Sequence, residues 1–121
     1  MRSFSVVSVP VTDQERAKQF YVDILGFDLV ADATFGDDLR WVQVAPPQAQ
    51  TSLALVTWFD EMPAGSLRGL VLDTDDIAQD YRELRGRGAT ITAPPADQAG
   101  GIFCFIKDPD GNTISLPQRT A

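Results

Sequence analysis

The chain has no histidine and only one cysteine, Cys104, among its 121 residues. Because histidine is the commonest metal ligand and the commonest general base in proteins, its absence disfavours both kinds of chemistry. A single cysteine excludes a disulfide within the chain and any metal site built from clustered cysteines. The apolar residues around Cys104 predict a buried, inert thiol, since no histidine is present to activate it as a nucleophile.

Positive charge is also scarce, with 10 Lys and Arg against 17 Asp and Glu and a formal net charge of −7. Without a basic stripe to neutralise phosphates, the chain is not expected to bind nucleic acid. It has neither an apolar run long enough to span a membrane nor the apolar core and cleavage site of a signal peptide. We therefore expect a cytoplasmic protein with no membrane partner, whose negative charge favours cationic or neutral ligands over anionic ones.

The composition is that of an ordinary globular domain, with 44% hydrophobic and 22% charged residues. In the first half, the alternating residues 4–11 predict a half-buried strand. Thr12 to Glu15 has the pattern of a capping box, which begins a helix that Gly26 is expected to end. Further strands are predicted over 27–31, 39–45 and 52–57.

The second half repeats this order. It has a predicted strand over 67–72, a helix from Asp75-Asp76 to Gly88, and strands over 89–92, 102–107 and 113–117. The segment 108–112 faintly resembles a calcium loop, but a hairpin turn with Asp110 and Gly111 at positive φ explains all its residues. We predict one α+β domain over 1–121, with βαβββ modules at about 1–57 and 67–118 joined by the linker 58–66.

Two blocks of residues resemble the vicinal oxygen chelate superfamily, which contains glyoxalases, bleomycin-resistance proteins and extradiol dioxygenases. The first block is Val11-Thr-Asp13, Ala17, Phe20-Tyr21 and Leu25-Gly-Phe27; the second is Asp75-Asp-Ile77, Tyr81, Leu84, Gly88 and 108–112. The resemblance covers nearly the whole chain. It implies two βαβββ modules paired edge to edge in a cup-shaped mixed sheet, with helices outside, the ligand site on the concave face, and a homodimer.

Enzymes of this superfamily hold a divalent metal with His and Glu side chains that point into the cup. At the corresponding positions this sequence has Val6, Ala54, Gly69 and Ser115. The resemblance therefore implies no metal site and no cofactor here. It disfavours metal-dependent glyoxalase or dioxygenase activity.

Strand parity predicts which side chains line the cup, because alternate residues of a strand face opposite sides of a sheet. If Val7 and Val9 pack under the helix, their neighbours in the strand face the cup, and the same reasoning applies to the other strands. The residues expected to contact a ligand are Phe4, Val6, Ser8, Trp41, Gln43, Ala54, Gly69, Phe103, Phe105 and Ser115. Aromatic groups mixed with a few polar ones are typical of small-molecule sites, although core packing or a subunit interface would also use them.

Two classes of function fit this pattern. The first is a metal-independent protein that binds a flat or aromatic, antibiotic-like small molecule, with cationic molecules among the candidates, as the likeness to bleomycin-resistance proteins implies. The alternative is an enzyme of the same superfamily, such as an isomerase, lyase or cyclase, that works with non-metal acid and base groups, Asp73 being the candidate. A third possibility is that the cup serves as an assembly surface.

Overall fold

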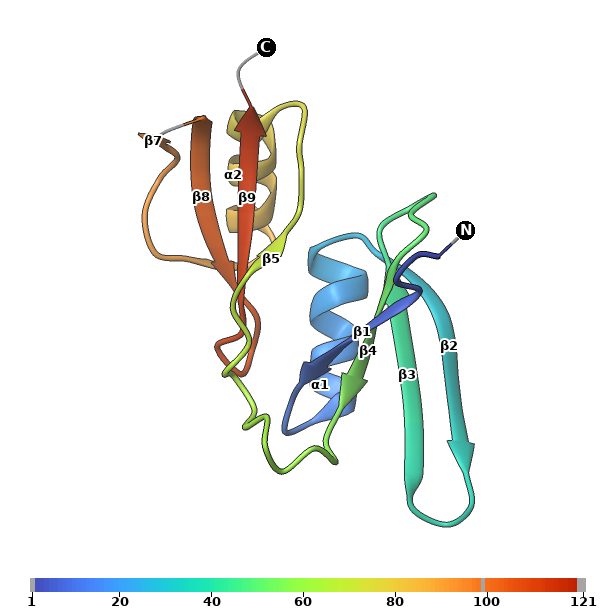
Figure 1. Ribbon diagram of the computed structural model, residues 1–121. Helices are drawn as coiled ribbons and strands as arrows, with labels where there is room; N and C mark the ends of the chain where they lie inside the picture. The colour runs from blue at the N-terminus through green and yellow to red at the C-terminus, as the bar shows by residue number, and fades with distance from the viewer. Residues whose placement is uncertain (1, 99, 120–121) are drawn as a thin grey trace.

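Each half of the chain forms its own sheet with a helix packed against it (Figure 1). The computed structural model describes residues 2–98 and 100–119. The first half contains β1 (Val6–Pro10), α1 (Gln14–Gln19), the π-helical turn η1 (Phe20–Ile24), β2 (Asp28–Phe35), β3 (Leu39–Ala45) and β4 (Ser52–Val56). The second half contains β5 (Leu70–Val71), α2 (Ile77–Gly86), β6 (Thr90–Ile91), β7 (Ala96–Gln98), β8 (Gly101–Lys107) and β9 (Thr113–Arg119).

The two sheets have matching topology. Strands follow the order β1-β4-β3-β2 in the first sheet and β5-β9-β8-β6 in the second, where β7 also pairs with β8. The first strand of each half is parallel to the last, while the remaining pairs are antiparallel. This arrangement confirms the predicted α+β fold; the first half has the βαβββ order, and the second half has the same order with the extra strand β7. In the described part of the chain, no helix has the length and apolar content needed to cross a membrane.

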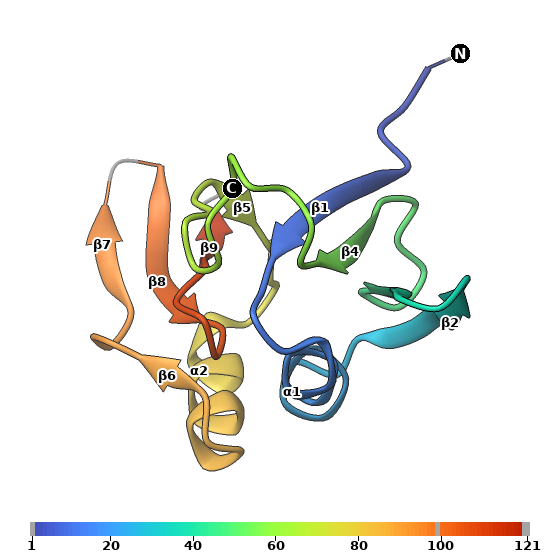
Figure 2. The same ribbon diagram turned by 90° about the horizontal axis from the view of Figure 1, so that it is seen from below.

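Both helices lie on the same side of the sheets (Figure 2). The core forms beneath them from alternate strand residues, including Val9 on β1, Val42 on β3, Leu55 on β4 and Ile106 on β8, all inaccessible to solvent. These residues are on the strand faces that parity assigns to the helices. The other face of each sheet therefore carries the side chains that the sequence predicts for the cup.

The turn at 108–112 joins the two halves. The Tyr21 hydroxyl of η1 donates a hydrogen bond to Oδ2 of buried Asp108 at 2.9 Å. Asn112, which is fully buried, donates from Nδ2 to the Pro10 carbonyl at 2.8 Å and accepts the Leu67 N–H at Oδ1 at 3.0 Å. Because these groups have no access to water, each bond is needed to satisfy a buried polar atom.

Two local predictions around the turns are wrong. The N-cap of α1 is Asp13, whose carboxylate accepts the Arg16 N–H, whereas the Thr12 hydroxyl donates to Asp110 of the other half at 2.6 Å. In the turn, Gly111 has φ of 98°, but Asp110 does not have positive φ. The Asp108 carboxylate accepts the N–H of Asp110 at 2.9 Å, and this side-chain turn makes a second left-handed residue unnecessary.

Some strand boundaries also differ from the prediction. Strand β2 continues to Phe35, because it pairs with β3 up to the tight turn at 36–38. The strand expected over 67–72 is reduced to β5, since the Leu67 N–H bonds to the Asn112 side chain and Gly69 has φ of 92°. Strand β7 was not predicted at all; its short, exposed segment has no apolar alternation.

Candidate ligand-binding site

The face of the first sheet opposite the helix carries a row of aligned predicted site residues. Ser8 on β1 lies opposite Ala54 on β4, and Ala54 lies opposite Gln43 on β3. Val6 precedes Ser8 on the same face, and Trp41 precedes Gln43. The structure thus brings five of the predicted residues together on one surface, although Ala54 itself has no exposed area.

A chain of hydrogen bonds fixes the polar groups on this face. The Trp41 indole N–H donates to Gln43 Oε1 at 2.9 Å, and Gln43 Nε2 donates to the Ser52 hydroxyl at 2.6 Å. The Ser52 hydroxyl in turn donates to the Ser5 carbonyl at 3.2 Å. Since each amide and hydroxyl has a partner, the carboxamide of Gln43 and the ring of Trp41 are held in one orientation.

The linker contributes an aromatic residue that was not among the predicted site residues. Trp58, two residues after the end of β4, stacks on Trp41 with 6.2 Å between ring centroids and 28° between planes. Phe59 packs against Trp58 at 6.2 Å and is about half exposed. The apolar character of the linker was the available signal in the sequence, but nothing in it specified that Trp58 would contact β3.

The predicted residues of the second half form a separate group. Phe105 on β8 lies opposite Ser115 on β9, which lies opposite Val71 on β5, and Phe105 is 38% exposed. Phe103 and Phe105 line a small cavity of about 80 Å³ with the segment around Pro94. Of five cavities formed by residues 2–98 and 100–119, Phe103 and Phe105 line only the one beside Pro94, and Trp41 lines none of the five.

Three further predicted residues lie outside both groups. Phe4 precedes β1 and is 82% exposed, Gly69 precedes β5 with open space where a Cβ would lie, and Asp73 is exposed just after β5. Within one chain, these three residues are not aligned with the row that contains Trp41. Because Phe4 is mostly exposed, a ligand held against it would need a second protein surface on its other side.

The positions that correspond to metal ligands in the superfamily do not fit a metal ion. Val6, Ala54 and Gly69 have no side-chain donor atom, and Ser115 offers only a hydroxyl. Among the described residues, no three His, Cys, Asp or Glu side chains gather into a possible metal site. The buried Cys104 is also unsuited to chemistry, since desolvation, with a smaller effect of Asp80, raises the pKa of its thiol.

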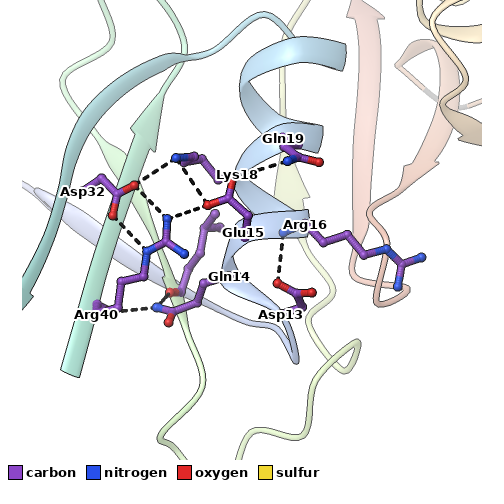
Figure 3. Close-up of polar contacts among 9 residues, drawn as sticks. Asp13, Gln14, Glu15, Arg16, Lys18, Gln19, Asp32 and Arg40 are labelled. Atoms are coloured by element: carbon purple, nitrogen blue, oxygen red, sulfur yellow. Dashed lines mark hydrogen bonds and ion pairs between the residues drawn. The ribbon is translucent and has the colours of Figure 1, made fainter. Parts of the chain in front are cut away.

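Charged side chains gather where the β2–β3 hairpin meets α1, on the helix side of the first sheet (Figure 3). Arg40 donates to both oxygens of Asp32 at 3.0 and 2.8 Å and to Glu15 at 2.8 Å, while Lys18 donates to Asp32 at 3.0 Å. The hydrogen bonds from Arg40, and then those from Lys18, hold the pKa of Asp32 well below its usual range. These ion pairs connect the β2–β3 hairpin to α1. The polar groups on the other face of the first sheet, Gln43 and Ser52, are uncharged.

Comparison with known proteins places this architecture in a family. Residues 3–116 match the family model of the Glyoxalase/Bleomycin resistance protein/Dioxygenase superfamily. The uncharacterized protein YetH of Bacillus subtilis is 32% identical over 98% of this chain and 99% of its own length.

Two solved structures from Streptomyces sp. CB03234 are similar to the whole chain. TnmS3, described as an antibiotic binding protein, is 49% identical with a TM-score of 0.92, over 99% of this chain and 98% of its own. A glyoxalase/bleomycin resistance protein is 52% identical with a TM-score of 0.83, over 96% of this chain and 100% of its own. The chain therefore belongs to the Glyoxalase/Bleomycin resistance protein/Dioxygenase superfamily.

Proposed function

We propose that this protein binds a small, flat aromatic molecule of antibiotic type, and that it does so without a metal. The observation that carries the proposal is the stacked pair of Trp41 and Trp58 beside Gln43 on the face opposite the helix. The likeness to TnmS3, an antibiotic binding protein at 49% identity, supports the same class of ligand.

The geometry suits a planar ligand. An indole offers a large, rigid aromatic surface, and aromatic pairs contribute about 0.5–1.5 kcal/mol beyond the area they bury. Gln43 supplies a carboxamide, fixed in orientation by its bond to buried Ser52, that orients polar substituents of the ligand. Because the ion pairs lie on the helix side and the net charge is −7, neutral and cationic ligands are favoured over anionic ones.

Intrinsic tryptophan fluorescence tests this proposal. We would titrate the protein with planar aromatic antibiotics, neutral and cationic, and with saturated ring compounds of similar size as controls. The planar compounds should quench or shift the emission, because both tryptophans are in the binding face. Absence of any response across the planar panel would contradict the proposal.

Calorimetry on variants locates the binding face. Trp41→Leu keeps an apolar side chain but removes the stacking surface, so affinity for a responding ligand should fall about three- to tenfold. Phe59→Leu is the control, because it also replaces an aromatic ring by leucine, at a half-exposed residue that packs against Trp58 and is not part of the Trp41–Trp58 stack. Equal affinities of Trp41→Leu and the parent protein would show that the ligand binds elsewhere.

We also propose that two copies of the chain associate. Large apolar side chains are exposed on and beside the edge strand β2, among them Leu29, Val30 and Phe35, in addition to Phe4. Apolar groups exposed together in this way are typical of protein interfaces. Light scattering at micromolar concentration should give the mass of a dimer, twice 13.2 kDa, and a monomeric mass would refute this assembly.

A further inference from the structure

A cavity lies between the two halves, on a different surface from the tryptophan pair. It has a volume of about 430 Å³, within the range of small-molecule sites. One wall is the face of α1 and η1 that carries Arg16, Phe20 and Ile24, and the other includes Thr90 and Lys107 at the β6–β8 pairing. Neither tryptophan lines this cavity.

Two cationic side chains line it without a counter-ion. Among the described residues, neither the Arg16 guanidinium nor the Lys107 ammonium makes an ion pair or side-chain hydrogen bond, in contrast to Lys18 and Arg40. Figure 3 shows Arg16 pointing away from the ion-pair cluster. Acidic partners are abundant in this chain, which has 17 acidic residues and 10 basic ones, yet both of these cations lie on one cavity without an ion pair.

The acidic residues of the cavity do not neutralise these cations directly. Oδ1 of Asp108 accepts the N–H groups of Asp110 and Asn112, and its Oδ2 accepts from Tyr21 and the Asn112 amide. These four bonds satisfy the lone pairs of the buried carboxylate, but their donors are uncharged, so the negative charge of Asp108 remains. Asp23 also lines the cavity and makes no ion pair within the described chain, so two negative charges accompany the two positive ones, and neither is paired with them.

We propose that this cavity binds a small monocarboxylate with a short apolar body. The carboxylate would pair with Arg16 and Lys107, and the apolar body would contact Phe20 and Ile24. The negative charges of Asp23 and Asp108 favour a ligand with one negative charge over a dianion. Repulsion from acidic groups farther than about 8 Å is screened at physiological salt, so the preference depends on direct pairing of the ligand with the two unpaired cations of the cavity.

Amide NMR with three aliphatic probes tests the proposal independently of the aromatic site. Hexanoate, hexan-1-ol and hexylammonium have similar shape and differ in charge, and none can stack on tryptophan. Hexanoate should shift the amide resonances of Gly88, Thr90 and Lys107, leave that of Gln43 in place, and bind more weakly as salt rises. No shift at these amides, or an equal response to hexylammonium, would overturn the proposal.

Variants identify the charged groups involved. Arg16→Gln and Lys107→Gln should each weaken hexanoate binding about two- to fivefold, and the double variant should weaken it further. Arg82→Gln on α2 removes an exposed cation away from the cavity and should leave affinity unchanged. Urea unfolding checks that the double variant is folded. If the folded double variant binds hexanoate as tightly as the parent protein does, Arg16 and Lys107 are not the groups that bind the carboxylate, and the proposal is refuted. The hexanoate experiment is independent of the fluorescence titration with antibiotics, because the two tests concern different surfaces, so a negative antibiotic titration would leave the hexanoate result unchanged.

Discussion

The hydrogen bond from Tyr21 to Asp108 allows a quantitative test of how the two halves are held together. Tyr21 has no exposed area, and its ring packs against Phe20 and Phe27 with centroid distances of 5.0 and 5.8 Å. Tyr21→Phe keeps these ring contacts and removes only the hydroxyl that donates to the carboxylate at 2.9 Å. A hydrogen bond to a charged group contributes about 1.5–3 kcal/mol. Since Asp108 keeps three other donors, we expect a loss near 1.5–2 kcal/mol in the free energy of unfolding.

Urea unfolding at pH 7 measures this difference, with Tyr81→Phe as the matched control. Tyr81 accepts an exposed hydrogen bond from Arg85 at 2.9 Å, so its hydroxyl should contribute less than about 0.5 kcal/mol. The comparison separates the buried bond from the general effect of removing a phenol. Equal stability of the two variants would refute the reasoning that Tyr21 joins the halves through Asp108.

The pH dependence of Tyr21→Phe provides a second readout. Burial, with the negative charge of Asp108, raises the pKa of Tyr21 above its ordinary value of 10.0. Above about pH 10 the unfolded chain loses this proton while the folded protein keeps it, so the stability of the parent protein falls as pH rises. The variant lacks this contribution, and the stability difference between the two proteins should therefore narrow above pH 10. A constant difference would contradict the linkage.

Two further predictions concern the linker and the charged cluster. Gly65→Ala should lower the free energy of unfolding by more than about 2 kcal/mol, because the new Cβ would lie 2.1 Å from the Asp110 carbonyl oxygen. Gly36→Ala is the control in the same urea assay. Gly36 also has positive φ but has open space around the new Cβ, so its variant should lose only about 1 kcal/mol. Asp32→Asn should lose less than about 1 kcal/mol at pH 7, since the ion pairs are partly exposed. Because the folded-state pKa of Asp32 is lowered, its contribution exists above pH 4 and disappears on acidification, so parent and variant should converge in stability below that pH.

The sequence predicts most of the sheet structure because alternation along a strand directly encodes which side is buried. Leu53 and Leu55, the neighbours of the predicted cup residue Ala54, pack under the helix, and Cys104 and Ile106, the neighbours of Phe105, are likewise in the core. Gly26 and Gly88 follow their helices with φ of 76° and 95°. The sequence predicts these two ends because a left-handed residue after a helix is strained in any residue that has a Cβ, and glycine has none.

Contacts between distant residues could not be read from local patterns. Thr12 satisfies a local capping rule, yet its hydroxyl bonds to Asp110 from the other half. The stack of Trp58 on Trp41 likewise depends on the path of the linker. The aromatic residues of the second sheet were placed on the cup face by parity alone, which does not determine their distance from Trp41.

The bonds at the 108–112 turn also affect the order in which the molecule can fold. Asn112 and Pro10 are 102 positions apart in sequence, and Thr12 and Asp110 are 98 apart. During synthesis, the first sheet leaves the ribosome long before these partners, so Tyr21 is without its acceptor until the β8–β9 hairpin has emerged. Contacts of such long range slow folding because the chain must lose the entropy of a large loop before it gains them. We therefore expect the first half to have these buried polar groups unsatisfied until the β8–β9 hairpin docks on it.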